Sequence, residues 1–168
     1  MKRTGFKFKP RKPLKRTRIR VVGHSDTADQ KREIQALLRQ IAILRDKGCV
    51  MRHHPETGKC GGYTKNGELI LQFDHLNSRV HAISFSDPRL GICVCQRHHI
   101  HFKPQYPFEY ERTAIAEIGP ERARLLSRVR EDRTPHKADL KLEAIVLRQE
   151  LRKMEQEEHR YLFEKIST

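Results

Sequence analysis

Residues 90–99 read LGICVCQRHH, and this stretch decides how the rest of the chain is interpreted. The apolar run from Leu90 to Val94 predicts a strand that returns toward Cys95. Residues 95–102 follow as a short helix. A Cys-x2-His step at a helix start, here Cys95 and His98, aims a sulfur and an imidazole at one point, as tetrahedral zinc requires. The stretch therefore predicts one half of a structural zinc site.

The remaining zinc ligands should come from residues 49–67, a segment rich in turn formers that a short chain can keep ordered only with an internal clamp. Cys60 lies across the expected strand pair from Cys95 and is the third predicted ligand. Cys49 is the best candidate for the fourth ligand. His53 or His54 could replace it within the same loop.

The cysteine content also points to a metal. Four cysteines occur beside ten histidines, and the N-terminus has no apolar segment of an export signal, so metal ligation is favoured over disulfides and a reducing compartment is expected. Cys93 lies inside the predicted strand and is expected to be an ordinary buried residue.

Three further residues suggest hydrolytic chemistry. Asp74 and His75 follow a strand predicted over residues 68–73, and His99 follows the zinc ligand of the short helix. A carboxylate and an imidazole that hold a hard cation, beside a second imidazole that can accept a proton from water, form a minimal set for phosphodiester hydrolysis. Neighbours on a regular strand face opposite sides, so one shared site requires the strand to end or bulge, and an irregularity is predicted at residues 74–76.

The order Cys60-Gly61, Phe73-Asp74-His75-Leu76 and Cys95-Gln96-Arg97-His98-His99 resembles an HNH (His-Me finger) endonuclease with the zinc-supported ββα-metal fold, over roughly residues 48–104. The pattern is similar to that of phage endonucleases that resolve branched DNA and of phage recombination nucleases of the Nin region. The resemblance implies a nuclease that acts in recombination or in the processing of branched DNA and leaves 5′-phosphate and 3′-hydroxyl ends. It implies that His75 is the general base, that Asp74 and His99 bind a catalytic Mg²⁺ or Mn²⁺, and that the structural zinc is held by Cys49, Cys60, Cys95 and His98.

Two features depart from the family pattern. Ten residues separate Cys49 from Cys60, where the first knuckle of the family usually has two between its cysteines. Leu90 stands where the asparagine that names the motif is expected. Orientation of His75 is therefore expected to come from a backbone carbonyl or from another side chain such as Asn77.

The sequence predicts an α+β fold in four parts: a disordered basic DNA-binding arm (1–24), an N-terminal helix (25–48), the zinc-supported nuclease core (49–104) and a helical C-terminal extension (105–168). Apolar spacing and capping residues predict helices at 27–47, 108–118, 120–132 and 136–163. The last helix carries an apolar seam that could pack on the body of the protein or form a homodimer: Leu140, Ala144, Leu147, Leu151 and Met154.

Charge identifies the expected partner. The net charge is +14, and residues 1–24 contain ten basic residues and no acidic one, which favours a polyanion such as single-stranded or branched DNA. Such an arm could instead aid solubility or act as a localisation signal. The predicted phosphate contacts are Lys12, Lys15, Arg16 and Arg18 in the arm and Arg79, Arg89, Arg97 and Lys103 near the site. His81 and His101 are expected at the surface.

Two other functions remain open. The same cysteines and His98 could clamp a non-catalytic, zinc-stabilised DNA-binding protein. Alternatively, the chain could be a recombination or assembly accessory with a decayed nuclease site, a reading that Leu90 keeps open and in which the C-terminal helix recruits a partner. No apolar run long enough to cross a membrane is found, so a cytoplasmic protein of a bacterium or phage-infected cell is expected.

Overall fold

The computed structural model describes residues 26–77, 85–132 and 138–166. This part of the chain is mixed α+β, mostly helical with a two-stranded sheet, as the sequence predicts. Three predictions lie outside the described residues: the arm with Lys12, Lys15, Arg16 and Arg18, the position of Arg79, and the position of His81. The elements in chain order are α1 (Asp26–Asp46), the 3-10 turns η1 (Val50–His53) and η2 (Pro55–Thr57), β1 (Leu71–His75), the 3-10 turn η3 (Pro88–Leu90), β2 (Gly91–Cys95), the π-helix η4 (His98–Phe102), α3 (Lys103–Gln105), α4 (Pro107–Glu131) and α5 (Leu140–Ile166).

The sheet consists of β1 and β2, which pair antiparallel from Leu71 opposite Cys95 to His75 opposite Gly91. The first strand begins later than the predicted 68–73, because residues 68–70 fold back on residues 62–64. In this turn the Ile70 N–H donates to the Gly62 carbonyl at 2.8 Å. The strand predicted at 90–94 is shifted by one residue, because Leu90 belongs to η3.

The strand ends at His75, within the range predicted for an irregularity, but it does not bulge at residues 74–76. Asp74 and His75 both lie in the regular ladder, and the Leu76 N–H continues it by donating to the Leu90 carbonyl at 2.9 Å. Gly91 permits this close pairing, since a Cβ at that position would collide with the Phe73 ring and the Asp74 carbonyl. Asp74 and His75 are the last two residues of β1, and their side chains point to opposite faces.

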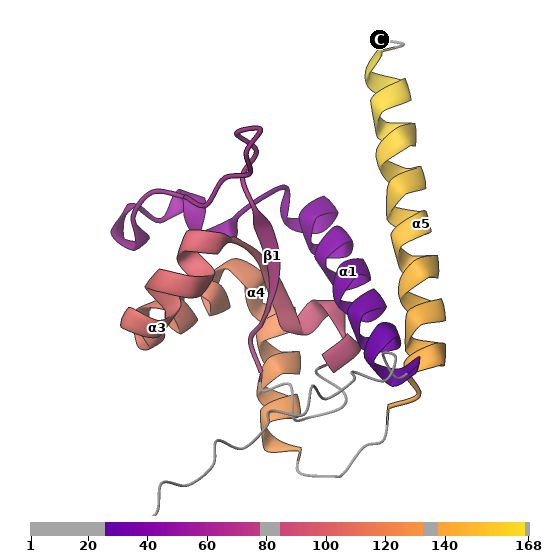
Figure 1. The fold of residues 1–168 in the computed structure, drawn as a ribbon, viewed down its shortest axis with the longest axis horizontal. Helices are drawn as coiled ribbons and strands as arrows, with labels where there is room; N and C mark the ends of the chain where they lie inside the picture. Colours follow the sequence, from indigo (N-terminus) through magenta and orange to yellow (C-terminus); the bar gives the residue numbers. More distant parts are fainter. Residues whose placement is uncertain (1–25, 78–84, 133–137, 167–168) are drawn as a thin grey trace, which may run out of the picture.

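One face of the sheet is covered by α1 and α5. Figure 1 shows α5 alongside α1, extending beyond the rest of the described chain at its C-terminal end. The shared core contains Phe73 and Cys93 from the sheet and Ile34, Leu38 and Ile41 from α1. The apolar seam of α5 contributes Leu140, Ala144, Leu147, Leu151 and Met154 to it, so packing on the body of the protein is confirmed as a use of this seam.

The other face of the sheet packs against α4. Ile92 and Val94 from β2 share a core with Tyr110, Ala114 and Leu126 of this helix. Gly119 has a φ of 77° inside α4 and separates two helical segments, in agreement with the separate helices predicted at 108–118 and 120–132. The two faces therefore belong to two cores, with β1 and β2 between them.

The outer edge of β2 is held by charged side chains. The Asp46 carboxylate accepts a hydrogen bond from the Cys93 N–H at 2.8 Å, and Arg45 Nη2 donates to the Gly91 carbonyl at 2.9 Å. Arg122 from α4 donates to the same carbonyl at 2.5 Å. Burial lowers the pKa of Arg122 to about 10, and the guanidinium stays charged at neutral pH. These side chains form hydrogen bonds with backbone N–H and C=O groups at the edge of β2, which would otherwise be unpaired.

Among the described helices, none combines the length and apolar character that a membrane-spanning segment requires.

Candidate functional site: two donor clusters on one helical turn

Four residues form a cluster of possible metal ligands, which we call the cysteine cluster: Cys49, Cys60, Cys95 and His98. One ligand atom from each residue lies within 4.8 Å of all the others. His98 Nδ1 is 3.1 Å from the Cys95 sulfur, 3.4 Å from Cys49 and 4.0 Å from Cys60. Three sulfurs and one imidazole nitrogen that converge on a point are a donor set that tetrahedral zinc takes, so this cluster could bind a metal ion such as zinc.

The orientation of His98 supports metal binding. Its ring is fully buried, and Nε2 lies 3.2 Å from the Thr57 carbonyl and 3.3 Å from the Gly58 carbonyl. A ring nitrogen that faces carbonyl oxygens carries the proton, so in the neutral ring Nδ1 presents its lone pair to the three sulfurs. Burial lowers the pKa of His98, which favours this neutral form.

The loop between Cys49 and Cys60 explains why ten intervening residues do not separate these ligands. The 3-10 turns η1 and η2 shorten the path, and the Thr57 hydroxyl donates to the Met51 and His54 carbonyls at 3.1 and 2.8 Å. Gly58 then turns the chain with a φ of 80°.

The geometry selects Cys49 as the fourth ligand over both alternatives. His53 is exposed and accepts a hydrogen bond from Arg52 Nε at 2.8 Å. His54 lies between two carboxylates, 2.7 Å from Glu117 and 3.2 Å from Glu56. Both rings are therefore engaged away from the cluster.

Cys93 lies apart from the other three cysteines and in the core, as the sequence predicts. Burial raises the pKa of the Cys49 and Cys60 thiols, and their sulfurs face one another. Such thiols become thiolates when a cation compensates their charge. Cys93 faces the α1 and α5 side of the sheet instead, where burial raises its pKa to about 12. It is a core residue outside the cysteine cluster.

A second cluster surrounds the Asp74 carboxylate, and we call it the Asp74 cluster. Lys103 Nζ donates to both carboxylate oxygens at 2.7 Å, and Tyr110 Oη donates to Oδ2 at 2.6 Å. His99 Nε2 lies 3.2 Å from Oδ1. Although burial raises the pKa of Asp74, hydrogen bonds from His99, Lys103 and Tyr110 outweigh it and bring the pKa to about 2. The carboxylate is therefore ionised at neutral pH.

His99 is held from its other side by Gln72. The Gln72 amide oxygen lies 2.5 Å from His99 Nδ1. Both ring nitrogens of His99 therefore face oxygen acceptors, Nδ1 the Gln72 amide and Nε2 the Asp74 carboxylate. Asp74 and His99, which the sequence predicts as a pair, are thus brought together.

The π-helix η4 gives consecutive histidines to different clusters. His98 begins the turn and points to the sulfurs, whereas His99 points to Asp74 at the end of β1. A π-turn is wider than an α-turn and often occurs where side chains must be redirected for function. One short element therefore positions a residue of each cluster.

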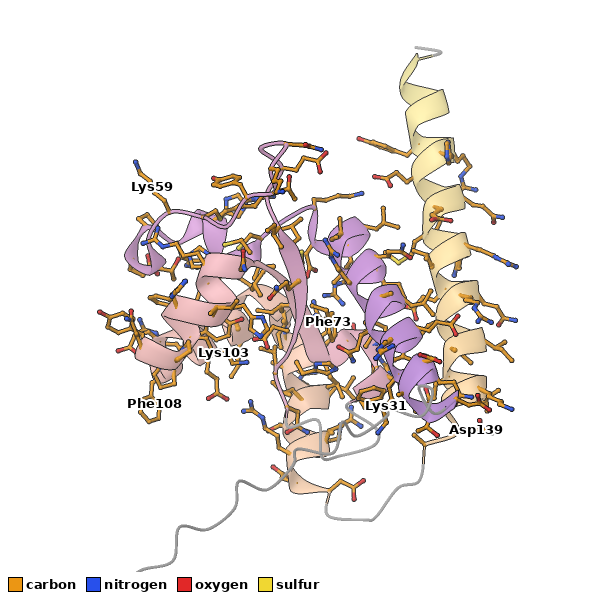
Figure 2. The ribbon with its side chains drawn as sticks, in the orientation of Figure 1. Lys31, Lys59, Phe73, Lys103, Phe108 and Asp139 are labelled. Atoms are coloured by element: carbon orange, nitrogen blue, oxygen red, sulfur yellow. The ribbon has the colours of Figure 1, made fainter. Side chains whose placement is uncertain are left out.

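His75 lies on the other face of β1 from Asp74. Its ring packs edge-on against Phe73, with the ring centroids 4.8 Å apart, and its Nε2 lies 3.2 Å from the Phe85 carbonyl. The expectation that a backbone carbonyl orients this ring agrees with that contact. Figure 2 shows Phe73 beside α1 and Lys103 on the opposite side of β1. Since His75 packs against Phe73 and Asp74 binds Lys103, these two side chains lie on opposite faces of the sheet.

The basic residues predicted to bind phosphate have different surroundings. Arg89 forms a two-pronged ion pair with Asp87, whose hydrogen bond raises the pKa of the arginine. Arg97 is exposed and donates to the Lys59 carbonyl at 2.6 Å. Lys103 binds Asp74, so the structure gives it a role close to the predicted catalytic residues. His101 is exposed, as predicted.

Two residues of the Asp74 cluster, Gln72 and Tyr110, were missed from sequence, and Lys103 was predicted only as a phosphate contact. Gln72 lies two residues before Asp74 and so shares its strand face, and Lys103 lies four residues after His99 on one helical stretch. These spacings could have indicated both residues. Tyr110 carries no such signal, because its position depends on how α4 docks.

Leu90, in the place of the expected asparagine, is fully buried in the core that α4 shares with β2. Leu90 is therefore a packing residue and contributes no polar group to either cluster.

Models of known protein families, curated proteins and solved structures give no match to this chain.

Proposed function

We propose that this chain is a metal-dependent DNA endonuclease of the HNH class, built on a zinc-supported ββα-metal finger. The observation that carries the proposal is the placement of His98 and His99 on one π-helical turn after β2. His98 reaches the cysteine cluster, and His99 reaches Asp74 at the end of β1. This is the relation between a structural zinc and a carboxylate-imidazole pair that the family resemblance implies.

Asp74 and His99 are proposed to hold a catalytic Mg²⁺ or Mn²⁺. The contacts of Asp74 support this proposal, because both of its carboxylate oxygens already bind a cation, the Lys103 ammonium group. A carboxylate oxygen is also the ligand type that hard divalent ions prefer. When bound, such an ion would neutralise charge on the phosphate and on the leaving oxygen.

His75 is proposed to be the general base. Its Nε2 faces the Phe85 carbonyl, so in the neutral ring Nδ1 is the nitrogen that would accept a proton. Because the ring is buried on the face of β1 opposite Asp74, this role requires the end of β1 to rearrange when DNA binds. In the proposed reaction, water loses a proton to Nδ1 and its oxygen bonds to phosphorus as the bond to the 3′ oxygen breaks. The leaving oxygen takes a proton from solvent, which gives 5′-phosphate and 3′-hydroxyl ends.

DNA is proposed as the substrate because of charge. The ten basic residues of the arm, in a chain of net charge +14, provide affinity for phosphates that does not depend on sequence. Action on branched DNA or in recombination is part of this proposal and rests on the family resemblance.

A second candidate function is a non-catalytic, zinc-stabilised DNA-binding protein. The observation that favours it is that His75 and Asp74 face opposite sides of a regular strand. In that case Asp74, Lys103 and Tyr110 would serve only to join β1 to α4.

The two candidates are separated by incubating the full-length protein with plasmid and with branched DNA, in Mg²⁺, in Mn²⁺ and without added divalent ion. We expect cleavage only with the divalent ion, reduced by about a hundredfold or more in His75→Ala and in Asp74→Asn. His101→Ala is the control for the loss of a histidine, since His101 is exposed on the π-helix η4. Unchanged cleavage by His75→Ala would remove that residue from the mechanism, and no cleavage of any substrate would favour the binding protein.

A further inference from the structure

The Asp74 carboxylate is buried and already has a counter-ion. Its side chain is 3% exposed, and Lys103 Nζ donates to both of its oxygens at 2.7 Å. Tyr110 Oη and His99 Nε2 approach the same carboxylate at 2.6 and 3.2 Å. A divalent ion that binds these oxygens therefore competes directly with Lys103.

Of the two partners, Lys103 is the one that can leave. Its side chain is 36% exposed, compared with 3% for Asp74, and it lies on the short helix α3 at the edge of the site. If Lys103 swings toward solvent, Tyr110 and His99 can remain on Asp74. The carboxylate then lacks only the positive charge, which a divalent ion can supply.

We propose that Lys103 exchanges between Asp74 and a DNA phosphate, so that divalent metal and DNA bind cooperatively at this site. The inference rests on the proposed function, because it assumes a divalent ion on Asp74 and DNA beside it. Metal alone displaces Lys103 into water, and DNA alone draws Lys103 away from a buried carboxylate. When both bind, the phosphate takes the ammonium group and the metal takes the carboxylate, so each exchange lowers the cost of the other.

Lys103 is suited to this exchange better than the other predicted phosphate contacts that the structure describes. Arg89 is held by Asp87, and Arg97 donates to the Lys59 carbonyl. Neither has a contact with Asp74 in the described residues. Lys103 is also a long, flexible side chain whose ammonium group can move without displacing the backbone.

The test is a Mn²⁺ titration of the full-length, zinc-loaded protein, with free Mn²⁺ measured by electron paramagnetic resonance, in the presence and absence of a short DNA duplex. All proteins carry His75→Ala to suppress cleavage. We expect DNA to lower the Mn²⁺ dissociation constant about fivefold or more when Lys103 is present. With Lys103→Met, the constant without DNA should already fall about tenfold, and DNA should then change it less than about twofold.

Lys59→Met is the matched control for the general loss of one positive charge, since Lys59 is exposed and lies apart from Lys103 in Figure 2. It should retain the effect of DNA. Lys103→Gln, which can still hydrogen-bond to Asp74, provides a second variant if Lys103→Met does not fold. Mn²⁺ affinity that is the same in the Lys103 variants and their parent, but is lost in Asp74→Asn, would overturn the exchange and leave the metal site in place. Mn²⁺ binding that is absent, or unaffected by Asp74→Asn, would overturn the proposed metal site and the exchange together.

Discussion

The cysteine cluster and the Asp74 cluster are served by neighbouring histidines, but they balance charge in different ways. In the first, three sulfurs and His98 Nδ1 converge on one another. In the second, one carboxylate is surrounded by donors, and Lys103 provides a full positive charge. The converging lone pairs of the cysteine cluster need a cation between them, whereas the Asp74 carboxylate already has the Lys103 ammonium group as its cation.

This difference indicates which site is structural. The cysteine cluster joins the loop of residues 49–60 to the end of β2 and the start of η4, and its thiols can ionise together only around a metal. The Asp74 cluster can form without a metal, because Lys103, Tyr110 and His99 satisfy the carboxylate. We therefore expect loss of the first site to affect folding, and changes in the second to affect stability modestly and function strongly.

The largest expected effect is that of Cys95→Ser. Structural zinc binds peptides of this kind with about 10 kcal/mol or more, which is comparable to the whole stability of a small domain. The variant should lose its zinc and its cooperative thermal transition. Zinc content and circular dichroism melting check this outcome.

Cys93→Ser is the matched control, because Cys93 is equally buried but faces the α1 side of the sheet. It should keep its zinc and lose only about 1 to 2 kcal/mol. Equal losses in the two variants would contradict the distinction between a ligand cysteine and a core cysteine.

A smaller effect is expected in the Asp74 cluster, from Tyr110→Phe. This change removes a buried hydrogen bond of 2.6 Å to a charged group, which costs about 2 kcal/mol. Urea unfolding without added divalent ion measures it. Thr113→Val, a buried polar change on the same helix, is the control and should not alter the acid dependence described next.

The same variant has a signature in pH. The folded pKa of Asp74 is about 2, below the ordinary value of 3.8, because hydrogen bonds from His99, Lys103 and Tyr110 outweigh burial. The resulting stability, about 2 kcal/mol, is present above pH 4 and is lost as the pH falls toward 2. Tyr110→Phe should raise the folded pKa and lose less stability over that range. An identical acid profile in the two proteins would show that Tyr110 does not hold this carboxylate.

Much of the fold was predictable because it depends on local pattern. The helical spacing in α1 and the seam of α5 predict which faces pack together, and Gly119 marks the break in α4. Three members of the cysteine cluster could also be named from sequence, because a Cys-x2-His step at a helix start requires further ligands from a nearby segment, and Cys49 was the best candidate for the fourth. The choice of Cys49 over His53 and His54 required the path of the loop, which follows from η1, η2 and Gly58.

The surroundings of Asp74 were less predictable, because they depend on docking between elements distant in sequence. Tyr110 reaches the carboxylate only after α4 packs on the sheet. A strand end or a bulge was expected at residues 74–76 on the assumption that Asp74 and His75 share a site. The ladder stays regular up to the end of β1 at His75 and places the two side chains on opposite faces of the sheet. The alternation of residues along a strand predicts which face each side chain occupies, but it does not predict which distant element packs against that face.

The smallest expected effect is at His54, in the loop of the cysteine cluster. Hydrogen bonds that His54 donates to Glu117, and more weakly to Glu56, raise its pKa above its ordinary 6.5. Its stabilisation is therefore full below that value and is lost as the pH rises through the folded pKa. Partly exposed ion pairs contribute about 1 kcal/mol or less, so the melting temperature should fall only slightly between about pH 6 and pH 8.

Glu117→Gln should remove most of this pH dependence, whereas His53→Gln should leave it. A loss as large as that of Cys95→Ser would mean that this ion pair, and not metal coordination, orders the loop, and the contrast between the two clusters would then fail.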